Sequence, residues 1–487
     1  MNNFISYIKN HGYMTAIALS FLYITPLMIA NFYYIDDVSR SVGGYARWID
    51  NGRPLAEWII ILMGFGGVVD IFPAPLILCA VVMITSGYYL CKKIGVTNKY
   101  SAIIISLSIL CSPFYIQNLS YRYDAFTMGL SVSLAIISSS VIYNTKNYLC
   151  FAVSAIAITA MMSLYQASLN AYIGVVCVLS IISMNTYGLK TTTAYCIKSI
   201  ASLLIGMIIY KIFIAEVFVS GGYSVTHSET VKVSYDSLDV ISRNIKSFMY
   251  VFDTTFSGRF GMIFYSAFFI SCTVCIITSY NSHSSYKFKI YNILFSFIAM
   301  SLLLFSIVGM MFSLKHPIFY PRVFIGFIGV MIFISIFTSV FIGGWLRLVP
   351  VILILCSFSQ MFAYGNALNS QKQKEDFIFS TMANDIINYN GKINKIRFNG
   401  RSGESQTSRF ASTRFGVMLH IVPTYIRPDW MFGAFYFGRM GVNVIYDLNI
   451  DLQKAVKEGC ENPYKENSIY TTIVHGDTMI FDFNRCN

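Results

Sequence analysis

Residues 12–30 read GYMTAIALSFLYITPLMIA, an uncharged and mostly apolar run that is long enough to cross a bilayer as one helix. Ten further apolar runs of similar length follow, over residues 71–91, 100–117, 125–143, 148–166, 168–186, 197–216, 260–280, 291–313, 323–342 and 348–366. Apolar residues make up 55% of the 487-residue chain and charged residues only 12%, about half of the share in soluble proteins. The sequence therefore predicts an all-α polytopic membrane protein with about eleven transmembrane helices. The composition excludes a cytosolic enzyme and a nucleic-acid-binding protein.

The apolar stretch over residues 55–69, LAEWIIILMGFGGVV, is shorter than these runs. It contains Glu57 near its start and leads into Asp70. We interpret it as an interfacial or re-entrant segment, with a twelfth span as the alternative.

The distribution of charge predicts the orientation in the membrane. If the N-terminus is cytoplasmic, the cytoplasmic connections hold bases and no acid, namely Lys9, Lys92, Lys93, Lys99, Lys146, Lys190, Lys198, Lys287, Lys289 and Arg347. The positive-inside rule favours this orientation, although the first outer loop also contains Arg40, Arg47 and Arg53. We therefore expect a bacterial inner-membrane protein with a cytoplasmic N-terminus. An odd number of spans then places the C-terminal part in the periplasm.

Residues 367–487 have the mixed composition of a soluble domain, with 14 basic and 12 acidic residues. The pattern predicts an amphipathic helix over 371–390 and β-strands in KINKIRF (392–398), FGVMLHIVP (415–423) and TMIFDF (478–483). We expect a membrane body over 1–366 and a small periplasmic α/β domain over 367–487. Cys460 and Cys486 are the only cysteines of this domain, so an oxidising compartment favours a disulfide between them, with two free thiols as the alternative.

The first outer loop, at about residues 31–70, is the strongest candidate for a site. It contains Asp36, Asp37, Asp50 and Glu57, four of the eleven acidic residues that precede residue 367. A carboxylate can act as a general base, and arginines such as Arg40 and Arg53 can hold a phosphate group. Tyr45 and Trp48 can stack on a sugar. The alternative is structural: the acidic pair caps a helix near Val38, and the arginines and tryptophans contact lipid headgroups.

Other outer-side residues are candidates for substrate binding. The loop LKHPIFYPR (314–322) supplies Lys315, His316 and Arg322, which could surround a lipid-linked phosphate, and the hairpin SYRYD (120–124) supplies Arg122 beside Asp124. Tyr165 and Gln166 could bind a sugar at the outer end of a span. The alternatives are headgroup contacts for the cationic residues and helix packing for Tyr165 and Gln166.

Several chemistries have no motif in this sequence. There is no Walker A sequence, no paired CxxC and no HExxH, and the six histidines are scattered, so we expect neither a cofactor nor a metal site. A divalent ion held by Asp36 and Asp37 is the alternative. Without a nucleotide-binding motif, an enzyme of this kind would take its activated donor from a lipid carrier in the membrane.

The first loop also resembles a known family. The runs YIDDVSR (34–40), GYARW (44–48) and NGRPL (51–55), which follow a single N-terminal span, are similar to the GtrII-like glucosyltransferases. Members of this family are serotype-converting enzymes of temperate phages and prophages and of bacterial relatives, and they modify the O-antigen of lipopolysaccharide. The chain length and the outer C-terminal domain are similar as well.

The resemblance implies a GT-C architecture with the catalytic acid in the first outer loop. The implied donor is undecaprenyl-phosphate glucose, and the implied acceptor is an O-antigen sugar on its own lipid carrier, with transfer on the periplasmic face and inversion at the anomeric carbon. Asp36 or Asp37 would be the general base, and Arg40 and Arg53 would be phosphate or carboxylate partners. Other implied partners are membrane lipids, the flippase and the enzyme that supply the donor.

Two alternatives remain at this point. One is a transporter or flippase for lipid-linked saccharides, against which we count the scarcity of acids within the spans. The other is a different envelope enzyme of the same fold, such as an O-antigen polymerase or a GT-C transferase for another sugar.

Overall fold

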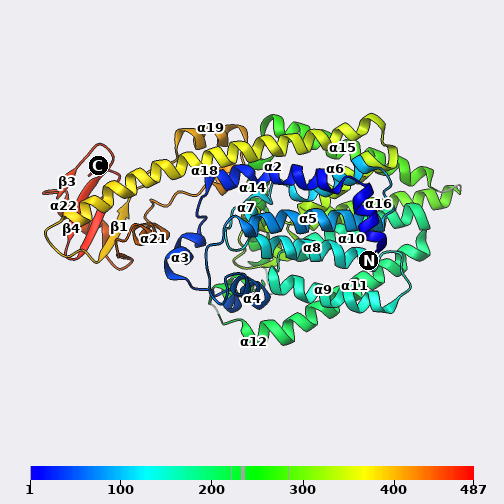
Figure 1. Cartoon of the computed structure of the whole chain (residues 1–487), viewed down its shortest axis with the longest axis horizontal. Helices are drawn as coiled ribbons and strands as arrows, with labels where there is room; N and C mark the ends of the chain where they lie inside the picture. The colour runs from blue at the N-terminus through cyan, green and yellow to red at the C-terminus, as the bar shows by residue number, and fades with distance from the viewer. Residues whose placement is uncertain (1, 221, 232–235, 283–284, 487) are drawn as a thin grey trace.

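The computed structural model describes residues 2–220, 222–231, 236–282 and 285–486. A bundle of helices occupies one end of the molecule and a small sheet occupies the other, and the helix α18 (Leu348–Asn388) runs through both (Figure 1). The preceding helices are α1 (Asn2–Asn10), α2 (Tyr13–Ala30), α3 (Asp36–Gly43), η1 (Ile49–Asn51), α4 (Pro54–Met63), α5 (Ala74–Lys93), α6 (Lys99–Leu110), α7 (Ile116–Leu119), α8 (Ala125–Val141), α9 (Tyr148–Leu164), α10 (Ser168–Tyr187), α11 (Leu189–Tyr210), η2 (Lys211–Ala215), α12 (Glu216–Phe218), α13 (Gly222–Ser228), α14 (Asp236–Thr255), α15 (Gly258–Asn281), α16 (Tyr286–Phe305), η3 (Gly309–Ser313), η4 (Pro321–Val323), α17 (Phe327–Ile336), η5 (Phe337–Ile342) and η6 (Gly344–Arg347).

A helix forms at each of the eleven predicted apolar runs, as expected for a polytopic membrane protein. Among the described residues, seven helices are long and apolar enough to cross a bilayer: α2, α5, α10, α11 with its extension to Phe218, α15, α16 and α18 with η6. The other four runs form shorter apolar helices, namely α6, α8, α9 and α17 with η5. The stretch 55–69, which we interpret as interfacial or re-entrant, forms the short helix α4.

The helix α6 shows why some runs give short helices. It ends at Leu110, three residues before Pro113, which cannot continue a helix. Residues 112–124 then form a connection that includes α7 and is buried throughout. In a membrane protein, irregular backbone of this kind is tolerated where it is surrounded by protein and not by lipid.

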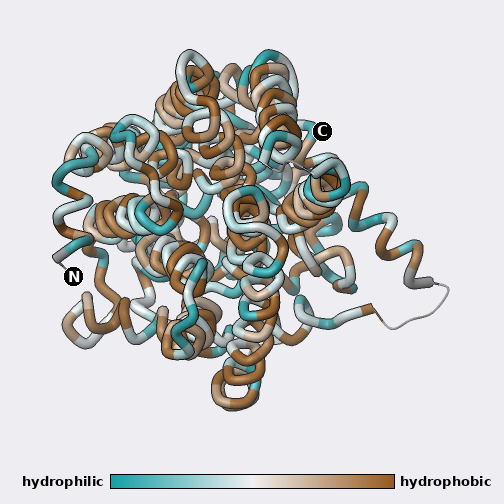
Figure 2. Tube along the Cα trace, turned by 90° about the vertical axis from the view of Figure 1, so that its right-hand side faces the viewer, coloured by the Kyte–Doolittle hydropathy of each residue, from teal (hydrophilic) through white to brown (hydrophobic). Residues whose placement is uncertain are grey.

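The outer surface of the bundle is apolar. Viewed from the end that holds the N-terminus, hydrophobic residues lie on the outward sides of the helices as well as between them (Figure 2). Met14, Ile156, Phe269 and Leu355 are examples of large apolar side chains that are more than half exposed. In water this surface would be unfavourable, and in a bilayer it contacts lipid tails.

The C-terminal part contains a five-stranded sheet in the order β2-β1-β5-β4-β3. Its elements are β1 (Lys395–Asn399), α19 (Gln406–Arg414), α20 (Met418–Ile421), α21 (Phe432–Arg439), β2 (Ile445–Tyr446), α22 (Leu452–Gly459), β3 (Lys465–Glu466), β4 (Thr471–His475) and β5 (Thr478–Asp482). The strand β1 is parallel to β2 and β5, whereas β3, β4 and β5 are antiparallel. Cys460 and Cys486 are joined by a disulfide.

The predicted strands in 392–398 and 478–483 are confirmed as β1 and β5, but the predicted strand in 415–423 is wrong. This segment forms the short helix α20, whose Met418 and Ile421 are buried. A short apolar run cannot be assigned to a strand or a helix by its pattern alone. Here its contacts with the helical bundle determine the outcome.

The helix α18 connects the two parts without a break. It contains 41 residues, and the expected domain boundary at 366–367 lies within it. Near its end, the buried carboxylate of Asp385 accepts hydrogen bonds from Lys465, from the Tyr470 hydroxyl at 2.7 Å and from Thr472 at 3.2 Å. The sheet is therefore attached directly to the last turns of this helix.

The first loop packs against the C-terminal part. The hydroxyl of Tyr34 donates to the carbonyl oxygen of Ile421 at 2.9 Å, and the hydroxyl of Tyr425 donates to the carbonyl oxygen of Tyr33 at 2.6 Å. These contacts join residues about 390 positions apart in the chain. They bring residues 31–53 and 401–439 together at the end of the bundle that lies away from the N-terminus (Figure 1).

Candidate active site

A cavity of about 1570 Å³ lies where the first loop, the bundle and the C-terminal part meet. Four groups of residues line it: the first loop (34–53), the ends of several bundle helices (117–128, 165–166, 210–219 and 224–228), the loop 318–323 and the C-terminal segment 401–432. The cavity therefore takes residues from segments that are far apart in the sequence.

The acidic pair of the first loop starts the helix α3. Ile35 adopts a positive φ of 49°, which turns the chain so that Asp36 and Asp37 form the first turn of the helix. Negative side chains are favourable at this end of a helix because of its dipole. The structural alternative, in which the pair caps a helix beginning near Val38, does not describe this arrangement, since both residues lie within the helix.

The two aspartates have different surroundings. Asp36 lines the cavity with 40% of its side chain exposed, and its carboxylate lies 3.8 Å from the guanidinium of Arg40. Asp37 is fully buried and accepts hydrogen bonds from the backbone N–H groups of Tyr34 at 3.2 Å and Arg122 at 2.8 Å. Burial raises the pKa of Asp37 to about 8, although the Arg122 N–H and the Arg40 charge oppose the rise. Of the two aspartates, only Asp36 presents its carboxylate to the cavity.

We expect the Asp37→Asn variant to be more heat-stable than the wild type at pH 8.5. The folded state keeps the Asp37 proton up to about pH 8, whereas an unfolded chain releases it near pH 4, so the free energy of unfolding falls as the pH rises between these values. Asparagine does not titrate, and its amide oxygen can accept the same backbone hydrogen bonds. The melting temperature of both proteins at pH 5 and pH 8.5 checks this expectation. The difference in melting temperature between the two proteins should be smaller at pH 5 than at pH 8.5. Equal pH slopes in the two proteins contradict it, and Asp36→Asn is the matched control.

Asp124 is the centre of the charged cluster behind the first loop. Its buried carboxylate accepts hydrogen bonds from Trp48 Nε1 and from the guanidinium of Arg53, both at 2.7 Å, and lies 3.8 Å from that of Arg40. Arg53 also donates to the carbonyl oxygen of Leu164 at 2.7 Å. Asp124 thus holds Arg40 and Arg53, two of the three arginines of the first loop, at the cavity wall.

Other residues predicted from the sequence also line this cavity. The guanidinium of Arg322 donates to the hydroxyl of Tyr121, and the hydroxyl of Tyr165 donates to the carbonyl oxygen of Arg322 at 3.2 Å. The amide of Gln166 donates to the Tyr210 hydroxyl at 2.9 Å. Tyr45 and Trp48 lie on the same wall as Asp36.

Besides Asp37, three predicted residues lie outside the cavity lining that the described residues form. Arg122 pairs with Asp70 at 2.8 Å, between the rings of Tyr33 and Phe72, where it holds the end of the first loop. Lys315 pairs with Glu229. His316 contributes its carbonyl oxygen to a hydrogen bond from His227.

Sequence reasoning missed several lining residues. Lys211 belongs to the π-helical segment η2 at the end of a membrane helix. A basic residue within a predicted span often marks a functional site, so the sequence could have indicated this residue. Asp124 was recognised as a charge beside the membrane but was not assigned to the site. The C-terminal segment contributes Arg401, Glu404 and Trp430, which no local pattern connects with the first loop.

One group of three side chains within the described ranges has atoms close enough to hold a metal ion, namely Cys460, Asp482 and Cys486. Both of its sulfur atoms are already joined in the disulfide, so the group does not fit a metal site. Asp37 does not line the cavity, and its Oδ2 atom accepts hydrogen bonds from two backbone N–H groups.

The arrangement places the accessible carboxylate of Asp36 among several cations. Arg40, Arg47, Arg53 and Arg322 line the same cavity as Asp36. Guanidinium groups suit a phosphate ligand because they donate paired hydrogen bonds. Such a cavity can hold an anionic leaving group beside a base.

Comparisons with known proteins agree with this interpretation. A family model described as glucosyl transferase GtrII matches residues 25–333, a range that includes the first loop and Asp124. A Salmonella phage P22 protein, described as an uncharacterized 55.3 kDa protein in the gtrB 5' region, is 32% identical over 479 residues, which cover 96% of this chain and 97% of that protein. No solved structure is significantly similar to the chain.

Proposed function

The chain belongs to the glucosyl transferase GtrII family, and from this premise we propose that it transfers glucose from undecaprenyl-phosphate glucose to a hydroxyl group of an O-antigen sugar. The observation that carries the proposal is the position of Asp36, whose carboxylate lines a large cavity together with the guanidinium groups of Arg40 and Arg53. The acceptor would be O-antigen on its own lipid carrier, and the result would be serotype conversion.

In the proposed reaction the acceptor oxygen attacks the anomeric carbon of glucose while the bond from that carbon to the phosphate oxygen breaks. The Asp36 carboxylate takes the proton of the acceptor hydroxyl. Negative charge develops on the leaving phosphate, and Arg40, Arg53 and Arg322 stabilise it. Because the displacement is a single step, the anomeric centre inverts.

We further propose that the reaction takes place on the periplasmic face of the inner membrane. Lys92, at the end of α5, lies near Phe4 of α1, at the end of the bundle that holds the N-terminus. The cavity and the C-terminal part lie at the opposite end (Figure 1). With a cytoplasmic N-terminus, the cavity opens on the side where lipid-linked saccharides are presented by their flippases.

The proposal is tested in cells that contain undecaprenyl-phosphate glucose and a defined O-antigen. We expect the wild-type chain to increase the mass of the repeat unit by one hexose, as measured by mass spectrometry of the released O-chain. Glucose isotopically labelled in the donor pool should appear in the product. If the well-expressed protein adds no hexose, the proposal fails, and transport of a lipid-linked saccharide becomes the leading alternative.

A further inference from the structure

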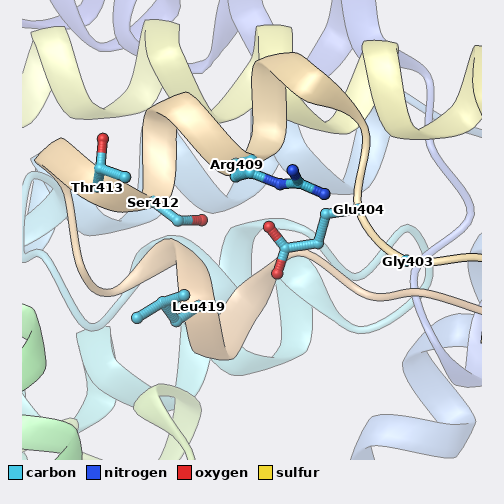
Figure 3. A pocket seen from close by; sticks show the side chains of 6 residues that line it. All are labelled: Gly403, Glu404, Arg409, Ser412, Thr413 and Leu419. Carbon is cyan, nitrogen blue, oxygen red and sulfur yellow. The ribbon is translucent and has the colours of Figure 1, made fainter.

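A second and smaller pocket of about 460 Å³ lies beside the main cavity. Its lining consists of Gly403, Glu404, Arg409, Ser412, Thr413 and Leu419 (Figure 3). Glu404 and Leu419 also line the main cavity, so the two spaces share a wall. A ligand that extended out of the main cavity past these two residues would reach the second pocket.

The loop that carries Glu404 is fixed to the helix α18. The amino group of Lys374 donates to the carbonyl oxygens of Ser402 at 2.6 Å and of Gly403 and Glu404 at 3.1 Å. Gln371 of the same helix accepts a hydrogen bond from the backbone N–H of Ser405 at 2.7 Å. The loop on this side of the pocket is therefore anchored to α18, a feature that favours binding because little ordering is needed.

A buried hydroxyl group in the pocket lacks a partner. Ser412 is only 6% exposed, and its Oγ atom has no hydrogen-bond partner in the part of the chain that the structure describes. Figure 3 shows this hydroxyl directed into the space between Glu404 and Arg409. Leaving a buried hydroxyl unpaired is unfavourable, so a polar group of a ligand in the pocket would find a free hydroxyl at this position.

The lining indicates the chemistry of that ligand. Arg409 offers hydrogen-bond donors, Glu404 offers acceptors, and Ser412 and Thr413 offer hydroxyl groups that can do both. Leu419 adds an apolar surface at the opposite side of the pocket (Figure 3). A sugar, with many hydroxyl groups and apolar C–H faces, matches this combination. The carboxylate of Glu404 would repel a phosphate headgroup.

We propose that this pocket is an outer subsite that binds sugar residues of the acceptor beyond the one that receives glucose. The inference rests on the proposed glucosyl transfer, since it assumes a saccharide acceptor in the main cavity. The pocket lies in residues 403–419, beyond the range 25–333 that the family model matches. It would therefore determine which saccharides this chain accepts, while the matched range would hold the donor.

The test measures binding without donor, so its outcome does not depend on glucose transfer. The probes are O-polysaccharide fragments of one and three repeat units, released from the lipopolysaccharide of the host bacterium, and inorganic phosphate. The full-length protein is compared with Arg409→Gln, with Thr413→Trp, which fills the pocket, and with Arg414→Gln. Arg414 is an exposed arginine of the same helix that lies outside the lining, so it is the matched control.

We expect the wild type to bind the three-unit fragment more tightly than the one-unit fragment. Arg409→Gln and Thr413→Trp should each weaken binding of the longer fragment at least fivefold more than binding of the shorter one, and Arg414→Gln should leave both within twofold. Three results overturn the inference: equal binding of the two fragments by the wild type, unchanged preference in both pocket variants, or displacement of the fragment by phosphate. A failure of hexose transfer with the expected binding pattern would refute the proposed function alone.

Discussion

Replacement of Asp36 by asparagine is expected to lower the rate of glucose transfer by about 10²–10⁴-fold, the usual contribution of a general base. Asparagine has nearly the same shape but cannot take the proton of the acceptor hydroxyl. The exposed position of Asp36 at the cavity means that the change leaves the folded protein intact. The initial rate of hexose transfer by purified protein, with the melting temperature measured in parallel, checks this expectation.

Asp37→Asn is the matched control for this experiment. Asp37 is buried and bonded to backbone N–H groups, so its replacement should leave the rate of transfer within about tenfold of the wild type. A rate within threefold of the wild type for Asp36→Asn would remove Asp36 as the base. If Asp37→Asn alone abolished transfer, the roles of the two residues would be reversed.

The Asp124→Ala variant is expected to be destabilised by about 3–5 kcal/mol, the range for breaking a buried ion pair. The change leaves the buried guanidinium group of Arg40 and the largely buried one of Arg53 without their shared carboxylate, and it removes the acceptor of Trp48 Nε1. Denaturant unfolding or the loss of melting temperature measures the effect. Transfer should be lost as well, because both arginines would leave the cavity wall.

A surface ion pair supplies the comparison for Asp124→Ala. Asp477 pairs with Lys395 at 3.4 Å, and both side chains are more than one-third exposed. Asp477→Ala should cost less than about 1 kcal/mol. If the two variants were equally stable, Asp124 would not organise the cluster, and the position of the arginines would depend on other contacts.

The sequence predicted the membrane helices because each one is encoded by a continuous apolar run. It also predicted that the first loop belongs to the site, because acidic residues are scarce elsewhere in the bundle. It did not separate Asp36 from Asp37. Their difference depends on the buried connection at Arg122, which places a backbone N–H against one carboxylate only. A pattern of residue types contains no information on such a contact.

The contribution of the C-terminal part to the cavity could not be predicted for a related reason. The contact from Tyr34 to Ile421 spans 387 positions, and no sequence pattern links the two residues. The error at 415–423 also lies in this part of the chain. That segment was assigned as a strand from its apolar residues, but those residues pack against the bundle as α20 instead.

The continuity of α18 has a consequence for how C-terminal parts can be exchanged among related chains. An α-helix turns by about 100° and advances by 1.5 Å with each residue. One residue inserted near position 366 would therefore rotate everything beyond it by about 100° and move Tyr425 out of reach of the first loop. Natural recombination or a designed chimera at this junction must therefore preserve the rotational position of the residues along α18. Successful exchanges of the C-terminal part should keep constant the number of residues between the last membrane turn of α18 and Gln371.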